Sequence, residues 1–455
     1  MPIVRKIMGS DSVASPSILA LSLLCMIWMI PKIINGFNIP TSALPLFLFT
    51  GYAIIATCLA FYYPLPAYKN FSEWRAPAIA LVTLLIGVLF FLTAGSFPES
   101  IGLKEKTFGL LNWSGLVLLC WSLVQALTWY SQNSYPQWMF DFQGLFSSRV
   151  LFRQRVTGFA LEPSWHAHQL NLLYLPYWFS ATIHNYSCSK LRLFCFSFEN
   201  ILLFFGSLIL GLTLSRVGYM AFLCLVFLTL HLLHYKFVEK IHNWIQQIKI
   251  FSRNNIHITK KILSLLIILT YIIAGVIALF LYSRIDPRMQ SLFSFDASQE
   301  NSFLRYFNQL KFGDRVIYWL SGWKIFNEYP ILGIGLGNAG FLIPDHIEPF
   351  GWSLVEVRSL IHRESLLLNI KSLWFRLLAE TGIIGFSLFC GWLFSLVSGF
   401  INKTKSDSKY IRVLGLMGLL TLAAMVFEGL SIDSFAMPYL WVSLGLASSI
   451  NINES

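Results

Sequence analysis

Charged residues are scarce in this sequence. Asp, Glu, Lys and Arg make up 12% of its 455 residues, whereas a soluble globular domain has about 25%. The apolar residues are instead grouped in blocks of about 18–25, the length that a helix needs to cross a hydrocarbon core of about 30 Å. The alternating segments of about 10 residues that indicate a transmembrane barrel are missing. The composition therefore predicts an all-α polytopic membrane protein.

Signals of several other protein classes are missing as well. The long polar segment 284–371 holds none of the 7 cysteines, so we expect no disulfide framework there. No Ala-x-Ala cleavage site follows the first apolar stretches, and we expect no removable signal peptide. No internal repeat or low-complexity linker is visible. Residues 1–455 are therefore predicted to form a single integral membrane domain, with 284–371 as a large loop within it.

The apolar blocks predict about 11–12 transmembrane helices. The stretches that qualify are 17–34, 41–63, 76–95, 113–130, 167–183, 200–214, 217–235, 262–282, 373–400, 413–429 and 432–450. The number of transmembrane helices is left open. With 11 helices and a cytoplasmic C-terminus the N-terminus lies outside, whereas Arg5 and Lys6 favour the inside.

Two basic loops predict the orientation. Residues 236–261 and 402–412 are rich in Lys and Arg, which favours the cytoplasmic side. The loop 284–371 between them then becomes extracytoplasmic, and so do 131–166 and the turn at Ser215-Arg216. The net charge of +11 reflects these loops, so we expect no nucleic-acid partner.

The first motif on the outer side is a group of arginines followed by an acidic helix start. Arg149, Arg153 and Arg155 precede Glu162-Pro163. Arginine forms paired hydrogen bonds to phosphate oxygens, but interfacial anchoring or pairing with nearby acids explains the cluster equally well. Proline suits the first helical position, so Glu162 is either a helix cap or a general base that faces a cavity.

Three other polar signals follow. His166-Ala-His168 could suggest a metal site, but residues two apart point to different sides of a helix, and no third ligand has suitable spacing. We therefore predict no metal. Arg216, in a turn almost without a loop, either binds an anionic headgroup or extends to lipid phosphates. The run 330–337 is glycine-rich without a strand–helix unit around it, so we expect a tight turn or close backbone packing.

The ends of the last helices hold further charges. Arg376 and Glu380 are four residues apart and are expected to pair across one helical turn. Glu428 and Asp433 bracket the last predicted outer turn; they either hold arginines or are solvated.

Together these residues resemble the O-antigen ligase and polymerase (Wzy-type) superfamily of bacterial surface-polysaccharide assembly. The matching pieces cover about half of the chain in the family's order. They are Arg155-x-x-Gly158 with Glu162-Pro-Ser164, Leu214-Ser-Arg216-x-Gly218, Asp314-Arg315 with Trp319, Pro330-x-x-Gly333-x-Gly335-x-Gly337, and Leu377-Leu-Ala-Glu-Thr-Gly382-Ile-Ile-Gly385.

The resemblance implies a GT-C-like glycosyltransferase whose Arg216 and Arg315 grip the diphosphate of an undecaprenyl-linked oligosaccharide. Ligases of the superfamily often carry His-Asn where this chain has Lys371-Ser372, and the Glu-Pro-Ser version of the earlier motif looks more like the polymerases. The resemblance therefore favours a polymerase of O-antigen, capsule or exopolysaccharide type.

The implied enzyme acts in the bacterial inner membrane, with its active site facing the periplasm. Arg153 and Arg155 are further diphosphate-binding candidates. Glu162 is the preferred general base and His362 the second candidate. Neither a cofactor nor a metal is expected, and the partners are lipid-linked substrate, membrane lipids and a chain-length regulator. The alternatives are a ligase or protein O-oligosaccharyltransferase with the same donor, and a transporter or flippase.

Overall fold

The structure is a computed structural model, and it describes residues 15–35, 41–100, 104–147, 151–247, 259–285, 313–364 and 366–449. Arg149 and the stretch 286–312 of the predicted long loop lie outside the described residues. Helices form nearly all of the regular structure in the described part of the chain. The all-α prediction is confirmed.

Most of the helices are α-helices. They are α2 (Ser15–Leu24), α3 (Ile30–Ile34), α4 (Leu44–Ala60), α5 (Arg75–Ser100), α6 (Lys104–Gln132), α7 (Gln137–Phe146), α8 (Pro163–Gln169), α9 (Leu175–Ile183), α10 (Phe198–Leu212), α11 (Arg216–Gln247), α13 (Lys260–Ile285), α16 (Gly313–Glu328), α17 (Ala339–Leu342), α18 (Val355–His362), α19 (Leu373–Thr404), α20 (Lys409–Glu428) and α21 (Pro438–Ser448).

Shorter elements connect them. Two π-helical turns, η1 (Cys25–Met29) and η3 (Leu170–Tyr174), join α2 to α3 and α8 to α9 without a break. The 3-10 turns are η2 (Thr41–Ala43), η5 (Ile343–His346) and η6 (Pro349–Ser353). Two short strands, β1 (Arg192–Leu193) and β2 (Phe196–Ser197), form an antiparallel hairpin.

Eight helices of the described residues are long and apolar enough to cross a membrane. They coincide with eight of the predicted spans, which confirms a polytopic membrane protein. The remaining three predicted spans correspond to shorter elements. Residues 163–183 are helical but pass through η3, and α10 has 15 residues. The last span was predicted from residue 432, but α21 begins at Pro438, because proline occupies its first turn and residues 429–437 form an irregular connection.

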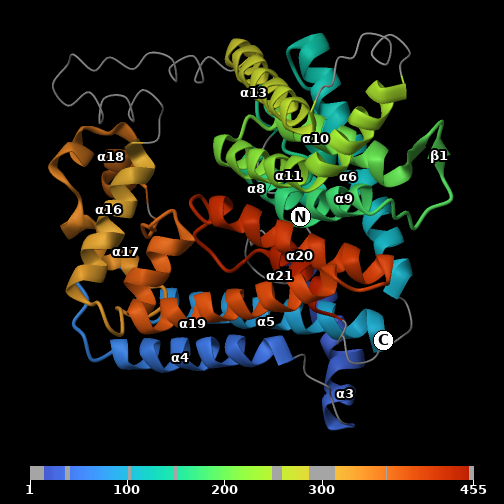
Figure 1. Cartoon of the computed structure of the whole chain (residues 1–455). Helices are drawn as coiled ribbons and strands as arrows, with labels where there is room; N and C mark the ends of the chain where they lie inside the picture. The colour runs from blue at the N-terminus through green and yellow to red at the C-terminus, as the bar shows by residue number, and fades with distance from the viewer. Residues whose placement is uncertain are drawn as a thin grey trace. The chain divides into compact units, whose positions relative to one another are not determined.

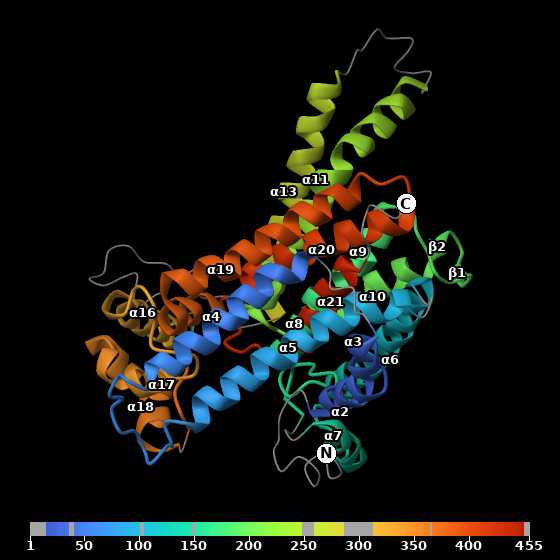
Figure 2. The same ribbon diagram turned by 90° about the horizontal axis from the view of Figure 1, so that it is seen from below.

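The chain divides into two compact units. The smaller unit, 226–317, contains the second part of α11 and all of α13. These two helices lie side by side (Figure 2). Val238 packs with Leu263 and Ile267, and His234 Nε2 lies 2.8 Å from Ser264 Oγ. The first turn of α16, with Asp314 and Arg315, also belongs to this unit.

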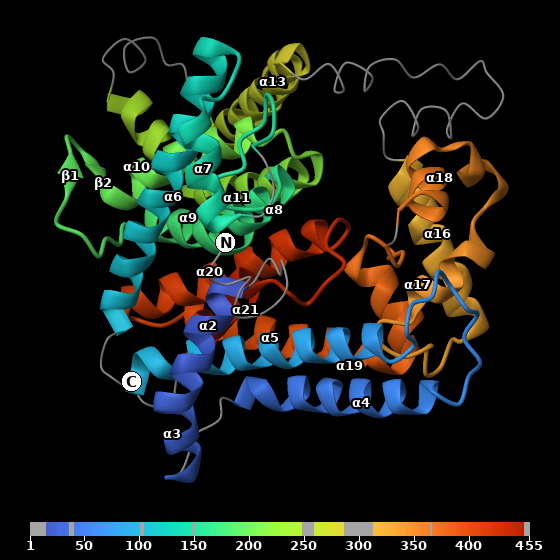
Figure 3. The same ribbon diagram turned by 180° about the vertical axis from the view of Figure 1, so that it is seen from behind.

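The larger unit, 1–225 and 318–455, contains the remaining helices. Helices α4, α5 and α19 run side by side, and α20 and α21 pack against them (Figures 1 and 3). Helices α6, α9 and α10 form a second group, which meets the first where α9 packs on α20. Ser197 caps α10 by accepting a hydrogen bond from the Asn200 amide.

The glycine-rich run 330–337 packs on a kink in α19. Gly382 has a φ of +62° and interrupts the helical backbone inside α19. The amides of Ile334 and Gly335 donate to the carbonyls of Ala379 and Glu380, at 3.1 and 2.9 Å. The prediction of close backbone packing is therefore confirmed, and two pieces of the family resemblance contact each other.

Space at this contact is too small for a side chain. Gly333 has a φ of +69°, and a Cβ added there would lie 2.5 Å from the Glu380 carbonyl carbon. A Cβ on Gly382 would lie 2.2 Å from the Ile331 oxygen. Glycine is needed at both positions because the backbones touch and both residues have a positive φ that other residues rarely adopt.

Gly333→Ala should lower the free energy of unfolding by at least about 1–3 kcal/mol, the cost of a strained backbone at one non-glycine residue. Gly391→Ala is the control, because Gly391 lies on α19 with nothing within 4 Å of an added Cβ. We expect the control to be neutral or slightly stabilising. Thermal unfolding of the purified proteins in detergent checks this, and equal melting temperatures for the two variants would contradict the packing.

Candidate active site

The candidate site begins where two separate arginine motifs meet. Arg155 Nε donates a hydrogen bond of 3.0 Å to the carbonyl of Thr213. The next residue, Val156, donates its amide to the Leu212 carbonyl, also at 3.0 Å. These bonds fix Arg155 on the turn that leads into α11. Its partner Thr213 lies three residues before Arg216. Two of the predicted diphosphate-binding residues therefore belong to one local structure.

The turn is built to place Arg216 at the start of a helix. Leu214 has a φ of +50°, a conformation that non-glycine residues seldom adopt. Ser215 Oγ accepts a hydrogen bond from the Gly218 amide at 3.3 Å, which is the geometry of an N-cap. Arg216 is the first residue of α11 and is half-buried. Its charge thus lies at the helix end whose dipole is positive.

Glu162 lies at the start of a neighbouring helix. It occupies the N-cap position of α8, and Pro163 follows as predicted, but the Glu162 side chain makes no capping hydrogen bond. Its carboxylate instead accepts from Ser164 Oγ at 3.4 Å. The carboxylate is therefore not used for capping, although the position of the residue was predicted correctly.

The helices that follow Glu162 and Arg216 are in close contact. A Cβ added to Gly218 of α11 would lie 2.7 Å from the Cβ of Ala167 on α8. Asn171, one turn further along, donates a hydrogen bond of 2.8 Å to the Gly218 carbonyl. Only a residue without a side chain allows α11 to approach so closely.

A buried glutamine supports the segment between Arg155 and Glu162. Gln125 of α6 is fully buried, and its Oε1 accepts from the amides of Thr157 and Gly158, each at 3.0 Å. Its Nε2 donates to the Gly158 carbonyl at 3.0 Å. This residue was not predicted from the sequence. A polar side chain inside an apolar block faces the bundle interior, and that signal would have identified it.

The two histidines face different helices, as their spacing predicted. His166 Nε2 lies 3.1 Å from Ser122 Oγ on α6. His168 Nδ1 lies 2.5 Å from the Glu428 carboxylate on α20. Among the described residues, no group of three or more His, Cys, Asp or Glu side chains is arranged to hold a metal ion.

A second polar group surrounds the start of α19. Arg376 Nε donates to Glu380 at 2.8 Å, and both side chains are mostly buried, which confirms the predicted pair. Arg376 also donates to the Asp433 carbonyl. Asp433 thus holds an arginine through its backbone, whereas Glu428 holds His168 instead of an arginine.

Lys371 stands where ligases of the superfamily often carry histidine. It has a φ of +54°. Its ammonium group pairs with Glu356 and lies 4.6 Å from the centre of the buried Tyr318 ring. Its carbonyl accepts from Trp319 Nε1 at 3.4 Å. The position is therefore occupied by a paired cation rather than by a base.

The other candidates are placed less centrally. Arg153 is exposed, two residues before Arg155. His362 is exposed at the end of α18, with its ring centre 6.1 Å from that of Trp352. Arg315 lies in the first turn of α16, in the smaller unit. Arg155 and Arg216 therefore share one turn of the larger unit, and Glu162 begins the helix that packs on α11.

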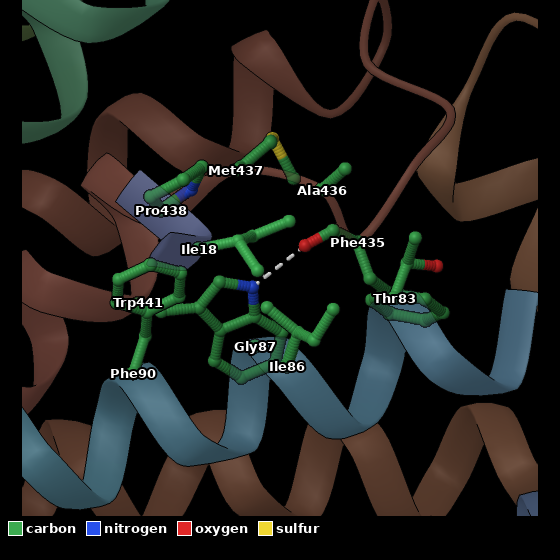
Figure 4. Close-up of a pocket in the computed structure, with 10 residues that line it drawn as sticks. All are labelled: Ile18, Thr83, Ile86, Gly87, Phe90, Phe435, Ala436, Met437, Pro438 and Trp441. Atoms are coloured by element: carbon green, nitrogen blue, oxygen red, sulfur yellow. Dashed lines mark hydrogen bonds between the residues drawn. The ribbon is translucent and has the colours of Figure 1, made fainter. Parts of the chain in front are cut away.

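The larger unit also contains a pocket that is lined mainly by apolar side chains. It lies between Ile18 of α2, Gly87 of α5 and the stretch from Phe435 to Trp441 (Figure 4). Trp441 Nε1 donates to the Phe435 carbonyl at 2.9 Å. The pocket lining has no charged side chain, so it suits apolar groups and not a phosphate.

The arrangement around Arg155 can bind an anion and activate a hydroxyl. Two guanidinium groups and a helix N-terminus next to one turn favour phosphate oxygens. A carboxylate at the start of the adjoining helix can accept a proton. These are the parts needed to transfer a group from a phosphorylated donor to a hydroxyl.

One family of known proteins matches the chain. Residues 201–390 match the sequence model of a family described as O-antigen ligase (Wzy_C). The matched segment includes Arg216, Arg315 and Glu380 but begins after Glu162, so the contact of Arg155 with Thr213 links the matched and unmatched parts. No curated protein matches the chain.

Gln125→Leu should loosen the segment that carries Arg155. The substitution preserves volume but leaves three buried backbone groups without their partner, each worth about 1–3 kcal/mol. We expect a clear drop in melting temperature and faster cleavage by trypsin after the exposed Arg153. Gln132→Leu, at the exposed end of α6, is the control and should change neither quantity. Unchanged cleavage in Gln125→Leu would contradict the supporting role.

Proposed function

Because residues 201–390 match the sequence model of a family described as O-antigen ligase, we propose that this chain polymerises a bacterial surface polysaccharide. The enzyme transfers a glycan from an undecaprenyl-diphosphate donor to a hydroxyl of another lipid-linked repeat unit. The reaction takes place at the periplasmic face of the inner membrane. The observation that carries the proposal is the hydrogen bond from Arg155 to Thr213, which joins two arginine motifs at one helix start.

The arginines stabilise the leaving group. When the acceptor oxygen attacks the anomeric carbon, the bond from that carbon to the diphosphate oxygen breaks, and undecaprenyl diphosphate leaves with the electron pair. Arg155 and Arg216 neutralise its charge, and the N-terminus of α11 adds the positive end of a dipole. Arg153 is a further cation of the proposed site, and Arg315, which lies in the smaller unit, is the other diphosphate-binding candidate that its motif implies. Because guanidinium groups supply the charge, the proposed reaction does not require a metal.

Glu162 is the proposed general base. It accepts the proton of the acceptor hydroxyl as the new glycosidic bond forms. Its carboxylate does not cap α8, and it lies at the start of the helix that contacts Gly218 of α11. His362, exposed on α18, is the second candidate for this role.

The residue at position 371 supports polymerase over ligase. Lys371 is engaged with Glu356 and the Tyr318 ring, and an ammonium group cannot serve as a base while it is charged. The description of the matching family keeps an O-antigen ligase as the second candidate function. The two reactions share the donor and differ only in the acceptor.

Arg216→Ala should abolish chain elongation in cells that depend on this gene, and Arg315→Ala should do the same. Removing one preorganised charge donor lowers a rate by about 10²–10³-fold, so single repeat units should remain at a normal protein level. Gel electrophoresis of the glycan measures this. Arg192→Ala, on the exposed hairpin, is the control and should give a full ladder. A normal ladder from both Arg216→Ala and Arg315→Ala would contradict the diphosphate site.

Glu162→Gln should also lose elongation, by roughly 10²–10⁴-fold if the carboxylate is the base. Because the side chain makes no capping bond, the melting temperature should stay within a few degrees of the wild type. Full-length glycan from Glu162→Gln would show that the residue only marks the start of α8.

A further inference from the structure

One buried carboxylate joins the elements around the site. Glu428, at the end of α20, is fully buried. Its Oε2 lies 2.5 Å from His168 Nδ1, and its Oε1 accepts a hydrogen bond of 2.6 Å from Asn171 Nδ2. Both partners belong to the helical run that starts after Glu162. They are three residues apart, so they share one face of that run.

The same amide extends the connection to the helix of Arg216. Asn171 Nδ2 also donates to the carbonyl of Gly218, at 2.8 Å. Gly218 is the third residue of α11, and Ala167 packs directly against it. Glu428 therefore holds the helical run that starts after Glu162. It does so at the point where this run contacts α11, the helix that starts at Arg216.

The residue after Glu428 anchors a third element. The carbonyl of Gly429 accepts from the Leu373 amide at 2.8 Å and from Ser372 Oγ at 3.1 Å. The start of α19 is thus attached to the same turn of α20. Two chain segments are therefore bound at two consecutive residues, and a third, the start of α11, is joined to them through Asn171.

Stability does not account for a carboxylate at this position. Replacing a buried ionic or polar cluster by apolar residues of similar size is often neutral or stabilising. An ionisable residue inside a membrane bundle is by default a candidate for function. A carboxylate also has two acceptor oxygens for two donors, whereas glutamine has one oxygen and an NH2 group. Glutamine must therefore lose one partner or reverse the tautomer of His168.

We propose that Glu428 is a positioning residue for glycosyl transfer. It fixes the start of the Glu162 helix relative to Arg216, so that the proton acceptor and the diphosphate site have the spacing that the reaction needs. This role rests on the proposed function. Misplacement of a reacting group by about 1 Å costs about 10²-fold in rate, and Glu428 acts through this geometry without touching the substrate.

The test uses purified full-length protein and a synthetic undecaprenyl-diphosphate-linked repeat unit. Glu428→Gln should lower kcat by about 10²-fold and leave the KM for the lipid-linked unit within about threefold, because the arginines are intact. Glu199→Gln is the matched control. Glu199 is also fully buried and accepts from Asn112 Nδ2 at 2.8 Å. The control should keep kcat within about threefold at a comparable change in melting temperature.

A double variant separates positioning from general weakening of the fold. Residues that act as one unit have strongly non-additive effects on rate, so Glu162→Gln/Glu428→Gln should be only slightly slower than Glu162→Gln alone. If Glu428→Gln fails to fold, Asn171→Ala replaces it, because that change cuts the link to Gly218 and leaves the carboxylate with His168.

Three results would overturn the role. They are an unchanged kcat in the Glu428 or Asn171 variant, an equal loss in Glu199→Gln, and effects that multiply in the double variant. Wild-type protein that elongates nothing contradicts the proposed function itself, and the positioning role falls with it. Wild-type elongation together with any of the three results removes only the positioning role.

Discussion

The contact of the Arg155 segment with the turn before α11 is the interaction on which the candidate site depends. Two hydrogen bonds of 3.0 Å, from Arg155 Nε to Thr213 and from the Val156 amide to Leu212, attach the segment there. Without these two bonds, Arg155 and Arg216 would belong to parts of the chain that are not connected at this point. The contact explains why a positive φ at Leu214 is tolerated, because the turn it forms presents the Thr213 carbonyl and starts α11 at Arg216.

The low dielectric of a membrane bundle determines which side chains support this contact. Buried polar groups are costly unless they are hydrogen-bonded, and two of them hold neighbouring backbone or other buried side chains here. Gln125 binds the backbone of Thr157 and Gly158, and Glu428 binds His168 and Asn171. At the kink of α19, Gly333 and Gly382 leave room for the backbones to bond directly. Rigid support of this kind is what preorganised electrostatic catalysis requires.

Local patterns in the sequence predicted the local features well. Eight of the spans were recognised from hydrophobicity, and the pair of Arg376 with Glu380 followed from helical spacing. The opposite directions of His166 and His168 followed in the same way. The contacts across the bundle were not predictable, because Asn171 and Glu428 are 257 residues apart and only helix packing decides that they meet. The start of α21 was missed in part for a similar reason, since Arg376 binds the carbonyl of Asp433 in the connection before that helix.

We propose that this chain is a glycosyltransferase that elongates a lipid-linked glycan. The most direct measurement incubates the purified protein in detergent with one undecaprenyl-diphosphate-linked repeat unit and follows the length of the lipid-linked product. We expect products of two and more units, together with release of undecaprenyl diphosphate, without a membrane potential or a closed vesicle. Transfer only to an added lipid A core or protein acceptor would indicate a ligase. No transfer to any acceptor, with movement of the lipid-linked unit across vesicles instead, would contradict a role as a glycosyltransferase.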